Sequence, residues 1–141
     1  MQALSTLAGV RGCARSRLYE TSPMEGPEQG DFLNAAMLLH TDWAAEQLLA
    51  STMRIEAEHE RIRLQANGPR TLDLDLLWID AEQVRLPALQ VPHPRLLERA
   101  FALVPLLELA PDARDPRTGE RLADSLQRLT VTGVREFQEP A

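Results

Sequence analysis

Residues 68–78 of this 141-residue chain read GPRTLDLDLLW, and the spacing of Asp73 and Asp75 within this stretch decides how the rest is interpreted. Leucine and aspartate alternate here, which is the two-residue period of a half-buried strand. The alternation predicts a strand over residues 72–79 whose even-numbered apolar side chains face the core. Residues two apart on a strand lie about 6.6 Å apart on the same face, so we expect both carboxylates to point the same way.

Paired carboxylates on one rigid element suit a hard divalent cation. Magnesium keeps several of its waters and takes one or two carboxylates together with substrate phosphates, so Asp73 and Asp75 are candidate ligands for metal ions beside a polyphosphate. A solvated strand face is the commoner situation for so short a motif. Aspartate is a poor strand former, however, and two aspartates on one face repel each other, which favours the metal site.

The basic residues point to the same chemistry. All 15 of them are arginines, and the 21 acidic residues bring the formal net charge to −6. A chain without lysine cannot use a P-loop lysine or a Schiff base, and an acidic balance argues against nucleic acid or an anionic membrane as partners. Arg61, Arg63 and Arg70 precede the aspartates and are candidate phosphate ligands. Exposed ion pairs with neighbouring glutamates explain the first two equally well.

Turn residues and apolar periodicity divide the rest of the chain into elements. Strands are expected over residues 13–21 and 32–41, separated by a Pro- and Gly-containing loop, and a helix is expected over 43–58. A mobile loop is expected at 59–70, and short helices between the prolines of 91–111. This order predicts an α+β fold, a ferredoxin-like βαββαβ sandwich in which helices cover an antiparallel sheet.

Length and hydropathy predict one domain spanning residues 1–141, because 44% of the residues are hydrophobic and the chain is too short for two full cores. No stretch approaches the roughly 20 apolar residues that cross a bilayer, so we expect a cytoplasmic protein. His93 lies between two prolines in VPHP, which fix its backbone. Its side chain is expected either to contact a ligand or to cap the next helix.

The ordered blocks LYETSP, DFLNAA, GPRTLDLDLLW, VPHP and ERAFALVPLLELAP closely resemble the hydroxymethyldihydropterin pyrophosphokinase family. The resemblance covers about residues 19–112 and implies a ferredoxin-like fold. It also implies an enzyme of folate biosynthesis that transfers pyrophosphate from ATP, its co-substrate, to 6-hydroxymethyl-7,8-dihydropterin, releasing AMP and using two Mg²⁺ ions. We expect such an enzyme to be a monomer.

The resemblance also implies roles for individual residues. Asp73 and Asp75 match the metal-binding aspartates, and together with three arginines they would carry catalysis: Arg61, Arg63 and Arg70. Those arginines would also contact ATP, as would Glu56 and His93. The pterin pocket would consist of Thr21, Phe32, Asn34 and Phe101, with the two phenylalanines sandwiching the ring.

One departure from the family affects the expected sheet. Members normally open with a strand that ends in a Gly-Ser-Asn turn, and this sequence has no such segment. The sheet is therefore expected to lack its first strand, and the chain to be truncated at its N-terminus. An inactive domain that keeps only nucleotide or partner binding is the main alternative. An unrelated two-metal phosphotransferase or nuclease is a third, although the acidic balance and absent lysine argue against a nuclease.

Overall fold

The computed structural model of the chain describes residues 7, 9–21, 32–66, 73–80, 82–129 and 134–136. Helices lie beside small antiparallel sheets, so the expected α+β, ferredoxin-like class is confirmed. The loop expected between the first two strands lies outside these residues.

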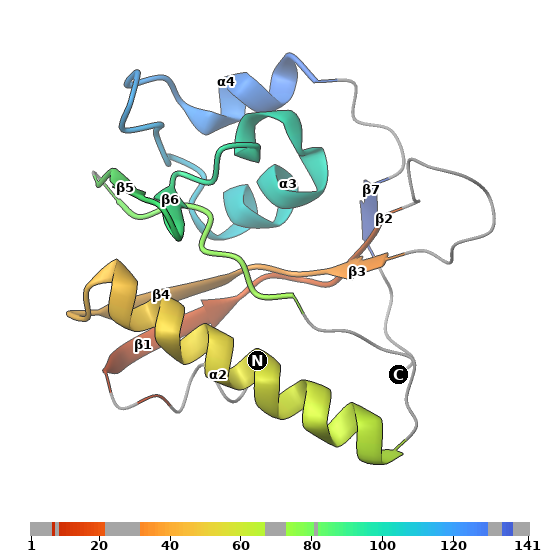
Figure 1. Cartoon of the computed structure of the whole chain (residues 1–141). Coiled ribbons are helices and arrows are strands. Elements are labelled where there is room, and N and C mark those ends of the chain that lie inside the picture. The colour runs from red at the N-terminus through yellow and green to blue at the C-terminus, as the bar shows by residue number, and fades with distance from the viewer. Residues whose placement is uncertain are drawn as a thin grey trace.

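Two chain segments form a long antiparallel ribbon, which runs across Figure 1. In one half of the ribbon, β1 (Val10–Arg15) pairs with β4 (Met37–Thr41). In the other half, β2 (Tyr19–Thr21) pairs with β3 (Phe32–Asn34). A further strand, β7 (Val134–Glu136), pairs with the other edge of β2. The two strands expected over 13–21 and 32–41 are thus confirmed as antiparallel partners. Each is divided in two, and the first begins three residues earlier than expected.

The division of the ribbon lies at Ser16 and Ala36. The Ser16 backbone N–H donates to the Ala36 carbonyl at 2.9 Å, and the Ser16 hydroxyl accepts from the Ala36 N–H at 2.8 Å. The hydroxyl in turn donates to the Arg17 carbonyl. Side-chain bonds of this kind replace ladder bonds locally, so the ribbon bends here without leaving buried polar groups unpaired.

The helix α2 (Ala45–Ala66) continues well past the expected end at residue 58. The mobile loop expected at 59–70 is therefore wrong over 59–66, and 67–70 lie outside the described residues. The stretch EHERIRLQA contains no glycine or proline and consists mainly of helix formers, and an ion pair joins Glu58 to Arg61 one turn on. Like the other described helices, α2 lacks the apolar length needed to span a membrane.

Residues 73–79 form no strand, so the strand expected over 72–79 is wrong for its described part. A strand requires a neighbour that shares a ladder of backbone hydrogen bonds, and no described strand pairs with this segment. Its backbone groups take separate partners instead. The Leu74 N–H donates to the Glu56 side chain, and the Leu77 carbonyl accepts from the His93 N–H.

The C-terminal half confirms the expected short helices. A hairpin of β5 (Val84–Leu86) and β6 (Leu89–Val91) leads into a 3₁₀ turn η1 (Leu96–Glu98), then α3 (Ala100–Leu109) and α4 (Leu122–Gln127). In Figure 1, α4 lies directly above α3, and α3 lies against the ribbon through contacts with β2, β3 and β4.

Apolar burial is concentrated around α3. Leu96, Leu103 and Leu122 have no exposed surface, and they form one cluster with Ala102, Leu106 and Ala113. A smaller cluster joins the start of α2 to the β5–β6 hairpin through Ala45, Leu89 and Val91. The segment 73–79 lies between these clusters, since Leu77 and Trp78 pack against the first and Leu76 and Ile79 against the second.

Candidate active site

The two aspartates lie on an extended segment whose exposure alternates. Asp73 and Asp75 are exposed, whereas Leu74 and Leu76 are half-buried, so the expected separation of carboxylates from leucines is present even without a strand. Both carboxylate-bearing residues line the same cavity. An extended chain turns successive side chains to opposite sides, which explains why this geometry survives without a ladder.

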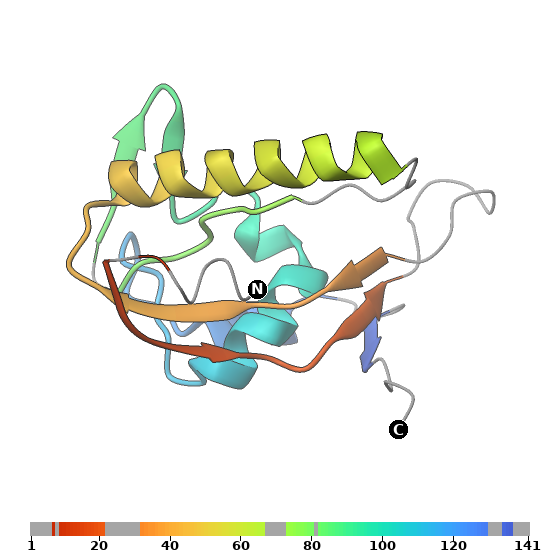
Figure 2. The same cartoon turned by 90° about the horizontal axis from the view of Figure 1, so that it is seen from below.

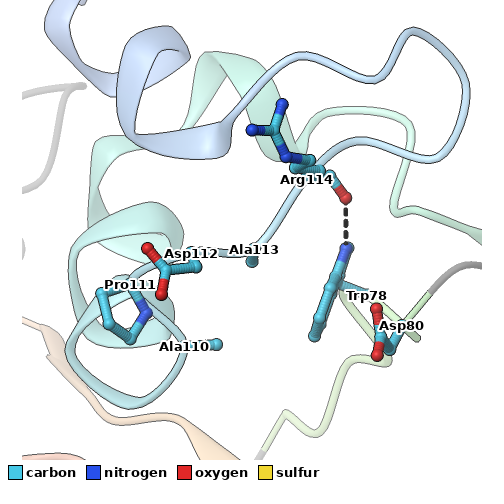
Figure 3. Close-up of a pocket in the computed structure, with 7 residues that line it drawn as sticks. All are labelled: Trp78, Asp80, Ala110, Pro111, Asp112, Ala113 and Arg114. Carbon is cyan, nitrogen blue, oxygen red and sulfur yellow. Dashed lines mark hydrogen bonds between the residues drawn. The ribbon is translucent and has the colours of Figure 1, made fainter.

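Three hydrogen bonds to separate parts of the chain help to hold this segment. The Leu74 N–H donates to the Glu56 Oε2 atom of α2 at 3.1 Å, and the Leu77 carbonyl accepts from the His93 N–H at 2.8 Å. The Trp78 indole Nε1–H donates to the Arg114 carbonyl at 2.8 Å (Figure 3). The position of the aspartates therefore depends on directed polar contacts from outside the segment.

A cavity of about 110 Å³ is lined by the two aspartates, by residues at the break in the ribbon and by the start of α3. Asn34, at the end of β3, lies on its wall beside Ala35 and Ala36, and Phe101 comes from the first turn of α3. Four residues that the sequence analysis assigned either to the metal ions or to the pterin thus line one cavity: Asn34, Asp73, Asp75 and Phe101. The small alanines at the ribbon break leave space for a ligand.

Arg99 also lines this cavity and was missed by the sequence analysis. Its guanidinium carbon lies 5.5 Å from the centroid of the Phe101 ring, within the range of a cation–π contact. The arginine therefore adds a positive charge beside an aromatic face, in a cavity that two carboxylates also line. Its position two residues before Phe101 in the ERAF block was the available signal.

A scan against protein-family models matches residues 1–111 to the 7,8-dihydro-6-hydroxymethylpterin-pyrophosphokinase family, which is well over half of the chain. The chain belongs to this family. The resemblance stated from the sequence motifs is thereby confirmed, and the family's enzymes give the cavity its chemical interpretation.

Curated relatives from distant organisms share this similarity. A 2-amino-4-hydroxy-6-hydroxymethyldihydropteridine pyrophosphokinase of Synechocystis is 37% identical over 93% of this chain and 67% of its own length. One from Pseudomonas aeruginosa is 39% identical over 97% of this chain and 84% of its own length. The chain also matches 18% of a folic acid synthesis protein of Pneumocystis carinii at 36% identity.

His93, which the pterin pyrophosphokinase resemblance assigns to ATP, lies near the aspartates but does not line the cavity. Its Nδ1 atom accepts a hydrogen bond from the Arg95 backbone N–H at 3.1 Å, so the proton of the neutral ring is on Nε2. Burial lowers the pKa of His93, and the charge of Arg99 adds to this effect, whereas the charge of Asp75 opposes it. The ring thus caps the following turn and also lies within the electrostatic reach of Asp75.

The predicted arginines are not brought to the cavity by the described part of the chain. Arg61 is exposed on α2 and pairs with Glu58, and Arg63 follows on the same helix with its side chain outside the described residues. Arg70 lies wholly outside them. The roles of these arginines remain predictions.

The remaining predicted residues lie on the ribbon and on α2. Thr21 and Phe32 are directly paired at the ends of β2 and β3, two residues from Asn34 along β3, and their side chains are outside the described residues. Glu56 lies in the middle of α2, and its carboxylate accepts from the Leu74 N–H. The backbone therefore places the Thr21–Phe32 pair at the outer end of β2 and β3, two residues farther from the ribbon break than Asn34.

The side chains available as metal ligands can be compared with those that Mg²⁺ prefers. Within the described residues, no group of three or more histidine, cysteine or acidic side chains could hold a metal. Two exposed carboxylates without further protein ligands do fit an ion that keeps its waters and arrives with phosphates. The pair Asp73 and Asp75 therefore suits Mg²⁺ bound together with a nucleotide better than a closed, all-protein metal site.

A second, wider cavity of about 340 Å³ lies at the other end of the same segment. Figure 3 shows the Trp78 indole and Asp80 on one side of it and Pro111 and Asp112 on the other. It contains none of the residues that the family motifs assign to ATP or the pterin. Chemistry rather than volume therefore identifies the smaller cavity as the candidate active site.

Proposed function

We propose that this chain transfers the terminal pyrophosphate of ATP to 6-hydroxymethyl-7,8-dihydropterin, giving AMP and the pterin pyrophosphate, as a step of folate biosynthesis. The observation that carries the proposal is the shared cavity of Asp73, Asp75, Asn34 and Phe101. Two carboxylates that would bind metal ions and two residues that would bind a flat heterocycle line one cavity there, as a transfer between ATP and a pterin alcohol would require. Family membership supports the same reaction.

The pterin end of the proposed site uses Phe101 and Asn34. A flat bicyclic ring packs well against an aromatic face, and a carboxamide both donates to and accepts from the amide-like edge of a pterin. Phe32 would supply the second aromatic face and Thr21 a further polar contact. Arg99, which forms a cation–π contact with the Phe101 ring, would help to hold that ring in place.

The phosphate end uses the two aspartates. Asp73 and Asp75 would hold Mg²⁺, and the bound ions would neutralise the phosphate oxygens and orient them for in-line displacement. Arg61, Arg63 and Arg70 would contact the phosphates as the family motifs imply, and His93 would contact the nucleotide. For Arg61 this requires exchanging its Glu58 partner for a phosphate oxygen.

The proposed reaction is a displacement at the β-phosphorus. The hydroxymethyl oxygen of the pterin forms a bond to that phosphorus and loses its proton, while the bond from phosphorus to the oxygen bridging it to the α-phosphate breaks. AMP departs with that oxygen. Little covalent chemistry is asked of the protein, so positioning of the two substrates by the cavity walls would supply much of the rate enhancement.

The deciding experiment measures AMP formation from ATP. We expect AMP to appear only when hydroxymethyldihydropterin and Mg²⁺ are both present, and to be lost in the double variant Asp73→Ala/Asp75→Ala. Asp80→Ala, an equally exposed aspartate at the other cavity, is the matched control and should retain activity. ATP binding without AMP formation would favour the inactive-domain alternative instead.

The form of the enzyme is part of the proposal. A net charge of −6 is unfavourable for contacts with nucleic acid or an anionic membrane, so the expected partners are ATP and the pterin alone, in the cytoplasm. A monomer would suffice for the proposed site, because all the residues that line the cavity come from one chain. Sedimentation of the purified protein at working concentration tests the monomer.

A further inference from the structure

Glu56 occupies an unusual place on α2. Ala45, Leu48 and Thr52 are buried and mark the inward-facing stripe of this helix. Glu56 follows Thr52 by four residues, which keeps it on the same stripe, and it is half-buried. A carboxylate in such a position destabilises the fold unless it is hydrogen-bonded, so its partner is informative.

That partner is the backbone of the aspartate segment. Glu56 Oε2 accepts from the Leu74 N–H at 3.1 Å, and Leu74 is the residue between Asp73 and Asp75. No described strand pairs with residues 73–79, so Glu56 satisfies an amide that a neighbouring strand would satisfy in a sheet. Figure 2 shows the helix α2 running alongside this segment.

We propose that Glu56 is a positioning residue whose carboxylate oxygen fixes the Leu74 backbone and thereby the direction of the Asp73 and Asp75 side chains. The catalytic consequence of this contact rests on the proposed function, whereas the contact itself does not. The Leu74 N–H is a neutral donor. Its hydrogen bond therefore requires an acceptor oxygen on the Glu56 side chain at the right distance, and does not require a negative charge. A direct contact of Glu56 with the nucleotide, as the family motifs imply, would depend on its charge or on other atoms.

Two substitutions separate these roles because they change opposite properties. Glu56→Gln keeps an acceptor oxygen at the same reach and removes the charge. Glu56→Asp keeps the charge and shortens the side chain by one methylene, which withdraws the acceptor from Leu74. Glu56→Ala removes both. Glu46→Gln, on the exposed first turn of the same helix, is the matched control for loss of a charge.

The first measurement uses the ligand-free protein and is independent of activity. Hydrogen exchange of the Leu74 amide, followed by NMR, reports its local opening. We expect exchange to accelerate by about two- to tenfold in Glu56→Asp and Glu56→Ala, as for loss of a hydrogen bond with a net value of about 0.5–1.5 kcal/mol, and to stay near the parental rate in Glu56→Gln and Glu46→Gln. Unchanged exchange in Glu56→Asp would overturn the proposal.

The second measurement is the Mg²⁺ dependence of AMP formation at saturating ATP and pterin. Loss of a group that orients metal ligands typically weakens metal affinity about 10- to 100-fold, so Glu56→Asp should need at least about tenfold more Mg²⁺ while Glu56→Gln stays close to the parental enzyme. The reverse order, with Glu56→Gln impaired and Glu56→Asp normal, would overturn positioning in favour of a charged contact. If the parental chain forms no AMP, the proposed function fails, and the amide-exchange result still decides whether Glu56 fixes Leu74.

Discussion

The helix α3 and the segment 73–79 meet at one cavity but are held by different forces. α3 presents Leu103 and Leu106 to a cluster with almost no exposed surface, and its first turn presents Phe101 to the cavity. The aspartate segment has no strand partner among the described residues and combines the packing of Leu76–Ile79 with three hydrogen bonds to residues outside the segment. One wall of the site is thus held mainly by packing, and the other by packing and directed polar contacts together.

This difference follows from what each wall has to do. A ring-binding surface can be apolar and continuous with the core, so packing and function favour the same residues there. Carboxylates that bind a hydrated ion have to remain exposed, so Asp73 and Asp75 themselves cannot be fixed by burial, although the apolar side chains of the same segment are. Stability and activity are therefore expected to separate when residues on the two walls are changed.

The largest expected effect is on the stability of the packed wall. Leu103→Ala removes a fully buried side chain from the α3 cluster, and large-to-small changes of this kind cost about 2–5 kcal/mol of the free energy of unfolding. Denaturant unfolding should show this loss, while kcat of the remaining folded protein changes little. A loss below about 1 kcal/mol would mean that α3 is not held by this cluster.

Phe101 lies on the cavity side of the same helix. Phe101→Leu should therefore lower pterin affinity and change the free energy of unfolding little. Leucine keeps most of the apolar volume but removes the aromatic face and the contact with Arg99. Aromatic pairs are worth about 0.5–1.5 kcal/mol beyond area burial, so pterin affinity should fall by about two- to tenfold. Isothermal calorimetry with the pterin, alongside unfolding curves, separates this from a stability effect. An unchanged affinity would remove Phe101 from the pterin pocket.

One of the hydrogen bonds that hold the aspartate segment can be removed at a distance from the carboxylates. Trp78→Phe keeps an aromatic ring but removes the indole N–H that donates to the Arg114 carbonyl, which should cost about 1 kcal/mol of unfolding free energy. Because Trp78 lies three residues beyond Asp75, we expect AMP formation to fall by less than about threefold, which is under 1 kcal/mol. A larger fall in activity than in stability would show that the far end of the segment also orients the aspartates.

The sequence predicted local structure well where side-chain pattern determines it. The antiparallel strands, the α3 region and the exposed direction of Asp73 and Asp75 follow from periodicities that do not depend on distant partners. The strand over 72–79 was wrong because a strand depends on a neighbour, and pattern alone does not reveal whether a ladder forms. The early end of α2 was wrong because polar residues were interpreted as a loop, although EHERIRLQA has high helix propensity.

The site was predicted in part for the same reason. Asn34, Asp73, Asp75 and Phe101 lie in recognisable family blocks, and the structure brings all four to one cavity. The Glu56 contact with Leu74 could not be predicted, because it joins residues 18 positions apart on two elements whose packing no local pattern specifies. Arg99 could have been predicted from the sequence, since it lies in the same family block as Phe101.

The smallest expected effect concerns the contact that ties α3 to the ribbon. The Tyr19 hydroxyl of β2 donates to Glu108 Oε1 near the end of α3 at 2.6 Å, and Glu108 Oε2 accepts from the Arg17 N–H. This hydrogen bond, together with burial and the nearby carboxylate charge, raises the pKa of Tyr19 from 10.0 to about 12. At neutral pH, Tyr19→Phe should cost only about 0.5–1 kcal/mol.

The pH dependence distinguishes this contact from the others. Between pH 10 and about 12 the unfolded chain loses the Tyr19 proton while the folded chain keeps it, so the free energy of unfolding falls as the pH rises through this window. The chain has one tyrosine and no lysine, so no other side chain ordinarily titrates there, and phenolate absorbance follows Tyr19 directly. Tyr19→Phe should show a flatter stability profile over the same range. An equally steep fall in Tyr19→Phe would assign the alkaline loss of stability to a cause other than the Tyr19 contact with Glu108.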